Sequence, residues 1–589
     1  MVSRGLSTSV TGASGVNLLF LLGALIVPLL IIGLIVFAVR QFVGRDGVGG
    51  SDGRGVRRFF QYLLLYGLSI VAAVGLSGLL GRLLEGPTLV SDDGPALARA
   101  LTFSVIGVPL FWVVGTWSRR RLQEDREEAR SLGWTFYATA APVTALAVAM
   151  FALHDVISWV LRVDRYDGPA LARLMVWGGF WLAHWLVVRR LTDDRRSQVH
   201  LAVGALIGLG TSVSGFISLL GAALEAVMRD GGGGVVVGER NQIAAAAATL
   251  LTGAPVWSIY WLGGLSKSPR TPLWFGYVLP LGVGGGLVTA IVAGSTVLYD
   301  TLVWFFGEPF STDAFSHFRN APTAIAAVAA GWLVWWYHRE VLEHAKTSDR
   351  TEVGRVYEYL VAGIGLLAAA GGITTVLVAV IEAITGSGGI DVGTAPINTL
   401  LAALTLLVVG GPVWWIFWRR IQRAVAVDAE EELTSPTRRI YLFILFGLGG
   451  VVAVIALLVG VFITIEDILE SRFGSEAVRS MRFALGLLAT TGAIAAYHWA
   501  VYRQDRGTVP ALRQPGPRYI LLIGQAGEEI PRQVARSTGA RVDLWPRTDG
   551  MSGSWTAADV AAALVGTDHL EVVVVSGPTG IDVIGIDRD

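Results

Sequence analysis

Residues Gly411–Arg423 read GPVWWIFWRRIQR, an apolar segment that ends in tryptophans and arginines. This order is typical of a helix that leaves a bilayer, because indole rings favour the interface and basic residues favour its cytoplasmic side. The same kind of ending recurs as PLFWVVGTWSRRR (109–121), FWLAHWLVVRR (180–190), PVWSIYWLGGLSKS (255–268), GWLVWWYHRE (331–340) and AAYHWAVYRQDR (495–506). The chain therefore contains an internal repeat, which predicts that its helices come in similar units.

The composition indicates a polytopic membrane protein. Hydrophobic residues make up 53% of the 589 residues and charged residues 16%, whereas soluble domains average about 25% charged residues. Cysteine is absent, which excludes disulfides and thiolate metal sites. The net charge is zero and gives no indication of nucleic-acid binding. Abundant glycine and an excess of arginine over lysine suggest a bacterial genome rich in G and C.

Thirteen membrane-spanning helices are predicted from the apolar segments. The first, at 16–39, is expected to be an uncleaved amino-terminal anchor within residues 1–40, and a glycine-rich cytosolic linker follows at 41–58. The membrane domain is predicted at 59–506, as six hairpins of two helices each. Their spans are 59–83, 97–117, 134–161, 171–188, 201–227, 241–265, 273–306, 321–337, 357–384, 398–418, 440–466 and 480–502.

Basic residues are concentrated in alternate loops between these spans. The positive-inside rule then predicts a bacterial plasma-membrane protein with its amino terminus outside and its carboxyl terminus in the cytoplasm. An even number of crossings separates successive hairpins, so all six are expected to point the same way. Such parallel repeats differ from the inverted repeats of many transporters.

One acidic residue lies near the outer end of the first helix of each predicted hairpin. These acids are Glu85, Asp155, Glu225, Asp300, Glu382 and Asp467. One interpretation is a ring or row of carboxylates that attracts a cation or an amine at the external mouth. The other is structural pairing with a nearby arginine such as Arg82, Arg162 or Arg173, because an acid at a helix C-terminus opposes the helix dipole.

The tryptophans near the cytosolic helix ends are interpreted as interfacial anchors rather than as a cation-binding site. They are Trp112, Trp117, Trp181, Trp185, Trp257, Trp261, Trp332, Trp336, Trp414, Trp418 and Trp499.

Glycines and one histidine within the predicted spans give weaker indications of how the helices pack. Glycines at 67, 75 and 78 and at 204, 208 and 215 predict close helix packing. The span that begins GYVLPLGVGGG at Gly276 is either packed in this way or interrupted beside water. The predicted spans contain almost no ionisable residues. The clearest one is His184, which lies close to the cytosolic arginines.

The two-helix unit resembles an uncharacterised bacterial membrane family, domain of unknown function 5671. The best copies are FFQYLLLYGLSIVAAVGLSGLL (59–80) with Trp112 and Trp117, and VYEYLVAGIGLLAAAGGITTVLVAVIEAI (356–384) with Trp414, Trp415 and Trp418. The resemblance covers about residues 57–506. It implies a membrane location and no known activity, so it assigns no functional residue.

The composition changes after Arg506. A linker rich in proline and glycine is predicted at 507–517, and a small cytosolic α/β domain at 518–589. Its expected elements are strands at 518–523, 541–545, 570–575 and 581–586 and helices at 528–537 and 556–565, with a Thr556/Asp559 capping box and a terminal hairpin. GQAG at 524–527 stands where a phosphate loop would, but Glu528 and Glu529 then disfavour phosphate.

These observations predict an all-α polytopic membrane protein with a small carboxyl-terminal α/β domain. No catalytic, cofactor-binding or metal-binding residues are predicted, and an enzyme is not expected. The expected function is a scaffold or sensor that packs with the lipid bilayer and reports through residues 518–589, by a cytosolic protein partner or by self-association. The alternative is a transporter or channel for a small solute or cation that uses the Gly276 span and the outer acids.

Overall fold

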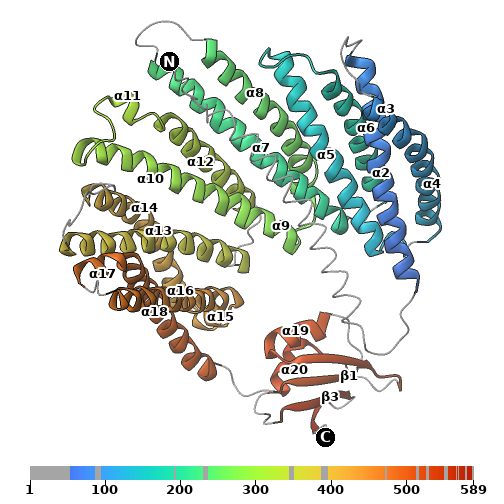
Figure 1. Cartoon of the computed structure of the whole chain (residues 1–589). Coiled ribbons are helices and arrows are strands. Elements are labelled where there is room, and N and C mark those ends of the chain that lie inside the picture. Colours follow the sequence, from blue (N-terminus) through green and yellow to red (C-terminus); the bar gives the residue numbers. More distant parts are fainter. Residues whose placement is uncertain are drawn as a thin grey trace. The chain divides into compact units, whose positions relative to one another are not determined.

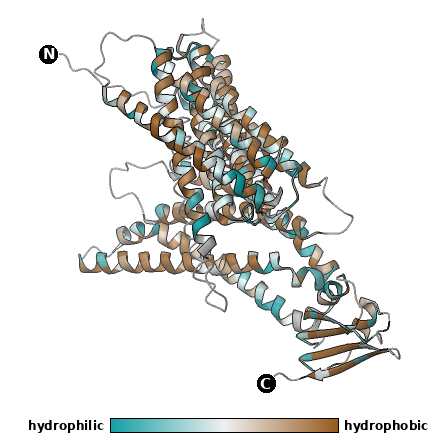
Figure 2. Cartoon of the chain, turned by 90° about the vertical axis from the view of Figure 1, so that its right-hand side faces the viewer, coloured by the Kyte–Doolittle hydropathy of each residue, from teal (hydrophilic) through white to brown (hydrophobic). Residues whose placement is uncertain are grey.

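The computed structural model describes residues 53–85, 94–125, 127–191, 194–229, 237–343, 351–385, 396–470, 474–512, 517–524, 529–549, 553, 555–564, 567, 569–577 and 580–586. The predicted anchor at 1–40 and most of the linker after it lie outside these residues. The described chain is mainly helical and ends in a four-stranded sheet, which confirms the predicted fold class in outline (Figure 1). Hydrophobic residues follow the helices along their length (Figure 2).

The first group of helices lies within residues 53–191. It comprises α2 (Gly53–Glu85), α3 (Gly94–Thr102), the π-helical turn η1 (Phe103–Gly107), α4 (Val108–Glu124), α5 (Leu132–Val160) and α6 (Gly168–Leu191). Helices α2, α5 and α6 all contact one another. Tyr62, Trp134 and Tyr137 form the centre of their shared core. Helix α5 also contacts α7 and α8, and 67% of its apolar window is buried, so it is the central helix of this part.

The second group of helices follows in the chain. It comprises α7 (Asp194–Arg229), α8 (Val237–Trp257) with η3 (Ser258–Leu262) and η4 (Leu265–Lys267), α9 (Pro272–Tyr277), η5 (Val278–Gly284), α10 (Gly285–Phe306), the short α11 (Ala314–His317) and α12 (Ala321–Glu343). Tyr260, Trp261, Trp274 and Tyr277 are fully buried or nearly so in its core. Bulky aromatic residues therefore fill the space between these helices.

The remaining helices are α13 (Glu352–Thr385), α14 (Pro396–Val427), α15 (Ala429–Thr434), α16 (Pro436–Leu469), α17 (Ser475–Ser480) and α18 (Arg482–Leu512). By their internal contacts the residues form two compact units, of which the second comprises Arg419–Ser471 and Leu487–Asp589. Within this second unit, Arg438 of α16 forms a buried ion pair with Asp505 of α18, with 2.6 Å between Nε and Oδ2. Phe446 and Trp499 also pack edge to face between these two helices.

Glycines bring the two helices of a pair into backbone contact. A Cβ on Gly208 or Gly215 of α7 would meet the backbone of Trp257 or Leu250, and a Cβ on Gly253 of α8 would meet the backbone of Ser212. The predicted packing role is thus confirmed here, and it holds equally for Gly75, Gly78 and Gly204. At Gly67 it is wrong, because a Cβ there would have no neighbour within 4 Å.

Eleven helical segments in the described part of the chain are long and apolar enough to cross a membrane. Each coincides with one of the predicted spans. The span predicted at 321–337 is also helical, as α12, but it does not meet the same criterion because its tryptophan, tyrosine and histidine side chains lower its mean hydropathy. The thirteen crossings and their orientation stay predictions.

The carboxyl-terminal sheet contains β1 (Tyr519–Gly524), β2 (Arg541–Pro546), β3 (Glu571–Gly577) and β4 (Gly580–Ile586), in the order β2-β1-β3-β4. Strand β1 is parallel to β2 and β3, and β4 returns antiparallel to β3 as the predicted terminal hairpin. Helices α19 (Glu529–Thr538) and α20 (Ala557–Ala563) contact each other and pack through Val534 and Val560 on one face of the sheet.

The predicted capping box is present at the start of α20. Thr556 and Asp559 bond reciprocally, and the hydrogen bonds from the Thr556 side chain and backbone lower the pKa of Asp559. The predicted strands and helices of this domain are therefore confirmed to within a residue or two.

Replacing Gly208 with alanine is expected to lower the temperature at which the detergent-solubilised full-length protein unfolds. The new methyl group has no room against the Trp257 backbone, and overpacking of this kind costs about 1–3 kcal/mol. Gly210→Ala is the matched control, because a Cβ two residues along the same helix meets nothing within 4 Å. Equal melting temperatures for the two variants would contradict the close backbone contact.

Candidate functional site

The six acids predicted near the outer helix ends differ in their partners and in their burial. Asp155 lies 3.6 Å from Arg173, one of the arginines predicted to pair with it. Glu382 lies 2.7 Å from Arg482 at the start of α18. Pairing with arginine thus neutralises carboxylates at the ends of these helices.

The other acids differ in environment. Glu225 pairs with Arg229 on its own helix, at 2.6 Å. Glu85 is exposed at the end of α2. Asp300 and Asp467 are each 8% exposed, and the backbone oxygen of Asp300 accepts a hydrogen bond from His317 Nε2 at 2.9 Å. The ligand-binding role of the six acids stays a prediction.

The acids show a longer repeat than the hairpin. The helices α2, α7 and α13 carry Glu85, Glu225 and Glu382, whereas α5, α10 and α16 carry the three aspartates. Glutamate and aspartate therefore alternate from hairpin to hairpin. This alternation indicates a repeating unit of two hairpins, a signal that is present in the sequence.

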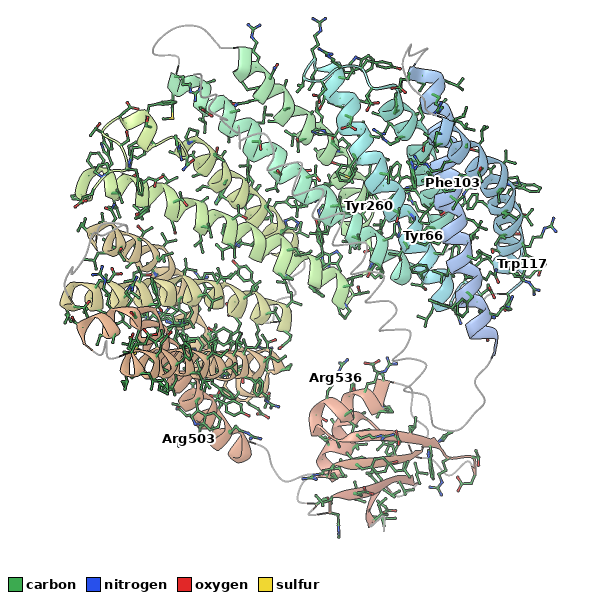
Figure 3. All side chains as sticks on the ribbon, in the orientation of Figure 1. Tyr66, Phe103, Trp117, Tyr260, Arg503 and Arg536 are labelled. Carbon is green, nitrogen blue, oxygen red and sulfur yellow. The ribbon has the colours of Figure 1, made fainter. Side chains whose placement is uncertain are left out.

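The predicted tryptophan anchors fall into three groups by burial. Five are exposed on apolar helices: Trp112, Trp117, Trp332, Trp336 and Trp499. Three are partly buried: Trp181, Trp257 and Trp414. Three are buried: Trp185, Trp261 and Trp418. Figure 3 shows Trp117 on the outer side of α4 and Tyr260 among the helices.

The buried tryptophans belong to the protein interior and not to a lipid-facing belt. Trp261 is fully buried, and its Nε1 donates a hydrogen bond to the Tyr337 hydroxyl at 2.9 Å. Trp181 Nε1 similarly donates to the Tyr260 hydroxyl at 2.7 Å, and this bond joins α6 to η3. The anchoring role of the exposed tryptophans stays a prediction.

A buried histidine occurs in the last long helix of each group. His184 in α6, His338 in α12 and His498 in α18 are 7%, 1% and 1% exposed. Their Nδ1 atoms lie 2.7, 2.8 and 2.8 Å from the carbonyl oxygen four residues earlier. A carbonyl can only accept, so Nδ1 carries the proton and Nε2 of the neutral ring is an acceptor.

Each of these histidines packs against a tyrosine from an earlier helix of its group. Tyr137 of α5, Tyr277 of α9 and Tyr441 of α16 have ring centroids 5.5, 5.9 and 6.0 Å from the respective imidazole centroids. In the first pair the Tyr137 hydroxyl donates to His184 Nε2 at 2.8 Å. This buried tyrosine–histidine pair was missed in the sequence, although both residue types recur in all three groups.

The Gly276 span is tightly packed at Gly282 and Gly286. Residues Val278–Gly284 form the π-helical turn η5, which accommodates Pro280. A Cβ on Gly282 would collide with the His338 ring, and one on Gly286 would meet the backbone of Trp335. Close packing, the first of the two interpretations of this span, therefore accounts for these glycines.

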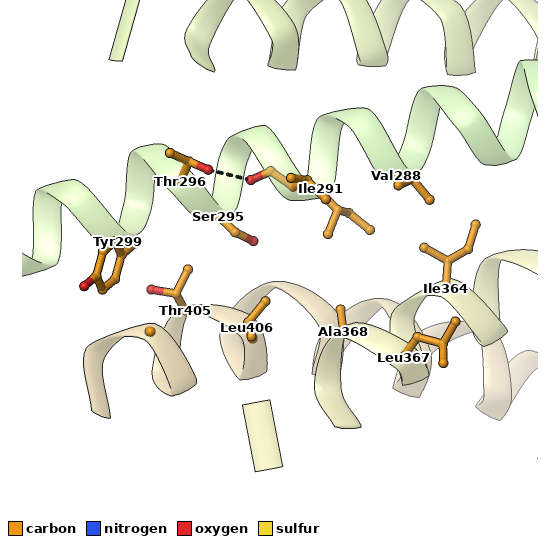
Figure 4. Close-up of a pocket in the computed structure, with 12 residues that line it drawn as sticks. Val288, Ile291, Ser295, Thr296, Tyr299, Ile364, Leu367, Ala368, Thr405 and Leu406 are labelled. Atoms are coloured by element: carbon orange, nitrogen blue, oxygen red, sulfur yellow. Dashed lines mark hydrogen bonds between the residues drawn. The ribbon is translucent and has the colours of Figure 1, made fainter. Parts of the chain in front are cut away.

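An apolar cavity of about 520 Å³ lies between α10, α13 and α14 and is open on one side, where Val292 and Leu367 are 61% and 70% exposed (Figure 4). Aliphatic side chains line most of it. Ser295, Thr296 and Tyr299 of α10 and Thr405 of α14 contribute hydroxyl groups. None of the six acids lines this cavity.

Metal and phosphate sites have little support. Within the described ranges, no three histidine or acidic side chains are grouped to hold a metal ion. Most of the GQAG segment at 524–527 lies outside the described residues, and Gly524 itself packs against Trp555 and Ser576.

Removing the Tyr137 hydroxyl is expected to destabilise the helical domain by about 1–3 kcal/mol, because Tyr137→Phe leaves buried His184 Nε2 without a donor. The measurement is thermal unfolding of the full-length protein in detergent. Adding His184→Leu should recover part of the loss, since two apolar partners leave no unsatisfied group. Tyr166→Phe is the control, because that hydroxyl bonds the Leu84 carbonyl at an exposed position. Equal losses for Tyr137→Phe and Tyr166→Phe would contradict the role of the buried pair.

Comparison with known proteins gives one family and no individual relative. The family model described as Domain of unknown function (DUF5671) matches residues 58–179, 198–331 and 355–522. No curated protein and no solved structure matches the chain. Each match takes in two of the predicted hairpins, as the alternation of glutamate and aspartate indicates. The three matches together cover more than half of the chain, which therefore belongs to this family of unknown function.

Proposed function

We propose that the protein is a non-enzymatic scaffold or sensor of the bacterial plasma membrane. Its helical domain packs with lipid or partner proteins, and its carboxyl-terminal domain acts in the cytoplasm, with the amino terminus outside. This proposal rests on how the helices pack: they are joined by contacts of aromatic residues and glycines. The six acids lie at the ends of six different helices.

The acids support this proposal over a transporter. Carboxylates that guide a cation through a membrane are expected to line a common hydrated path. Here Asp155, Glu225 and Glu382 each face an arginine within 3.6 Å. An acid that is already paired has less charge to offer to a permeating cation.

The packing of the Gly276 span supports it further. The glycines of a transport helix would be expected to border water. Gly282 instead adjoins the His338 ring, and Gly286 adjoins the Trp335 backbone. The described cavity beside α10 is apolar and offers no charged group to an ion.

The sheet of the carboxyl-terminal domain supports a role in association. Helices α19 and α20 both pack on the face that carries Ile520 and Val572. The opposite face carries Ile523 and Trp545 side by side, and Val573 beside Ile584. Trp545 is 59% exposed and Ile584 52% exposed. Exposed apolar side chains of this kind favour contact with a second copy or with a cytosolic protein, although Arg541, Asp543, Glu571 and Asp582 lie on the same face.

Vesicles that contain the full-length protein are expected to pass sodium or potassium no faster than protein-free vesicles, as measured with an ion-sensitive dye inside them. Glu382→Gln and Asp467→Asn should leave this rate unchanged. Asp313→Asn, at an exposed loop position, is the control. Flux that depends on the protein and falls in Glu382→Gln but not in Asp313→Asn would establish the transporter instead.

Charge on the open face of the sheet is expected to reduce association of the protein. Trp545→Glu with Ile584→Glu should lower the cross-linked fraction, or the mass by light scattering, to that of a variant that lacks 518–589. Arg536→Glu, on exposed helix α19, is the matched control. Unchanged association after removal of 518–589 would contradict a role for this domain in assembly.

A further inference from the structure

The cavity between α10, α13 and α14 has one polar end and one apolar end. Along α10, the lining residues Val288, Ile291, Ser295 and Tyr299 recur at helical spacing, so they share one face. The hydroxyl-bearing positions are the later ones, toward the end of α10 at Phe306. Figure 4 shows Ser295 and Tyr299 together with Thr405 at one end of the cavity.

Ser295 differs from the other hydroxyl residues around it. Thr289, Thr296 and Thr301 of α10 each donate to the carbonyl oxygen four residues earlier, at 2.8, 3.1 and 2.7 Å. Thr405 of α14 does the same at 2.8 Å. Ser295 is only 8% exposed, and its Oγ has no hydrogen-bond partner among the described residues. A buried unpaired hydroxyl is unfavourable, so Ser295 is a donor that lacks its acceptor.

The opposite end of the cavity is aliphatic. Val288 of α10 faces Ile364, Leu367 and Ala368 of α13 there (Figure 4). The cavity volume of about 520 Å³ is in the range of small-molecule sites. Its shape therefore fits a molecule with a long apolar body and one oxygen.

The depth and charge of the site narrow the ligand class. Ser295 lies about three helical turns, or roughly 16 Å, before the end of α10. A charged lipid headgroup at the membrane surface would not reach this depth. No charged side chain lines the cavity, and burying an unpaired ion would cost too much free energy. The ligand must therefore be neutral.

We propose that this cavity binds a neutral membrane-dissolved lipid whose hydroxyl or carbonyl oxygen accepts a hydrogen bond from Ser295 Oγ. Tyr299 and Thr405 surround the oxygen-bearing end, and the apolar body extends toward Val288 and Leu367. A long-chain alcohol and a quinone both have this chemistry. The site goes beyond the scaffold or sensor role and does not depend on the carboxyl-terminal domain.

The test uses the full-length protein in phosphatidylcholine nanodiscs. The probe is 1-hexadecanol with a photoreactive diazirine on its chain, and the measurement is saturable labelling of peptides from α10, α13 and α14 by mass spectrometry. Unlabelled hexadecanol and decylubiquinone should displace the probe. Hexadecane, which has no oxygen, should compete with an affinity at least about fivefold lower than that of hexadecanol. The stronger of the two displacing compounds identifies the alcohol or the quinone as the better ligand.

Two kinds of variant test the site itself. Ser295→Ala should weaken labelling about fivefold without lowering the melting temperature of the ligand-free protein, because the hydroxyl has no partner to lose. Thr301→Ala is the control, since it removes a hydroxyl of the same helix that does not line the cavity. Ala402→Phe and Ala368→Phe fill the cavity from α14 and α13, and either should abolish labelling.

The proposal is overturned if Ser295→Ala labels as strongly as the unaltered protein. It is also overturned if hexadecane competes as well as hexadecanol, because the cavity would then hold ordinary lipid chains. Labelling that persists in a folded Ala402→Phe or Ala368→Phe protein would place the probe elsewhere. None of these outcomes bears on vesicle flux or on association through residues 518–589.

Discussion

Backbone contact between the two helices of a pair is the interaction on which the helical structure depends. Lipid chains are as apolar as leucine, so helices in a bilayer associate through close packing rather than through a hydrophobic driving force. Gly208 and Gly215 of α7 meet α8, and Gly365 and Gly372 of α13 meet α14. In both pairs the glycines are seven residues apart, two helical turns, so they lie on one face. The return contact comes from Gly253 in α8 and Gly410 in α14.

This close packing decides how polar groups are accommodated. Inside the helices, many threonine hydroxyl groups bond to the preceding turn, and the three repeated histidines bond to a carbonyl oxygen of their own helix. Near the helix ends, arginines pair with acids: Arg58 lies 2.7 Å from buried Glu128, and Arg438 lies 2.6 Å from Asp505. Most of these polar side chains therefore bond within the protein and stabilise its fold. Ser295 is one of several buried hydroxyl groups without a partner among the described residues, and it is the one of these that lines the described cavity.

Close helix packing and paired acids also argue for a scaffold or sensor rather than a transporter. A domain of this size could carry transport, but a permeation path needs polar groups that face a shared space. Asp155, Glu225 and Glu382 are each paired with an arginine, and the π-helical turn at Val278–Gly284 is packed against α12. A membrane domain that binds a neutral lipid and carries an association module would need neither a hydrated path nor a catalytic group.

The sequence by itself determined the helices, their approximate ends and the elements of the carboxyl-terminal domain. Apolar length, capping residues and turn residues act locally, so Thr556 with Asp559 and the strands around it could be read directly. The family was also recognisable, because its aromatic and acidic residues lie at helix ends. Its repeat was predicted as one hairpin, whereas the family matches and the alternation of Glu225 with Asp300 indicate two.

Only the tertiary structure decided which side chains meet. Tyr137 and His184 are 47 residues apart in the sequence, and the corresponding separations in the other groups differ because both the helices and the connections between them differ in length. No fixed spacing therefore predicts the pair. Whether a tryptophan near a helix end is exposed, as Trp332 is, or buried, as Trp261 is, depends on the neighbouring helix. The cavity beside Ser295 likewise arises from three helices far apart in the chain, because helix packing and not local sequence sets the space between them.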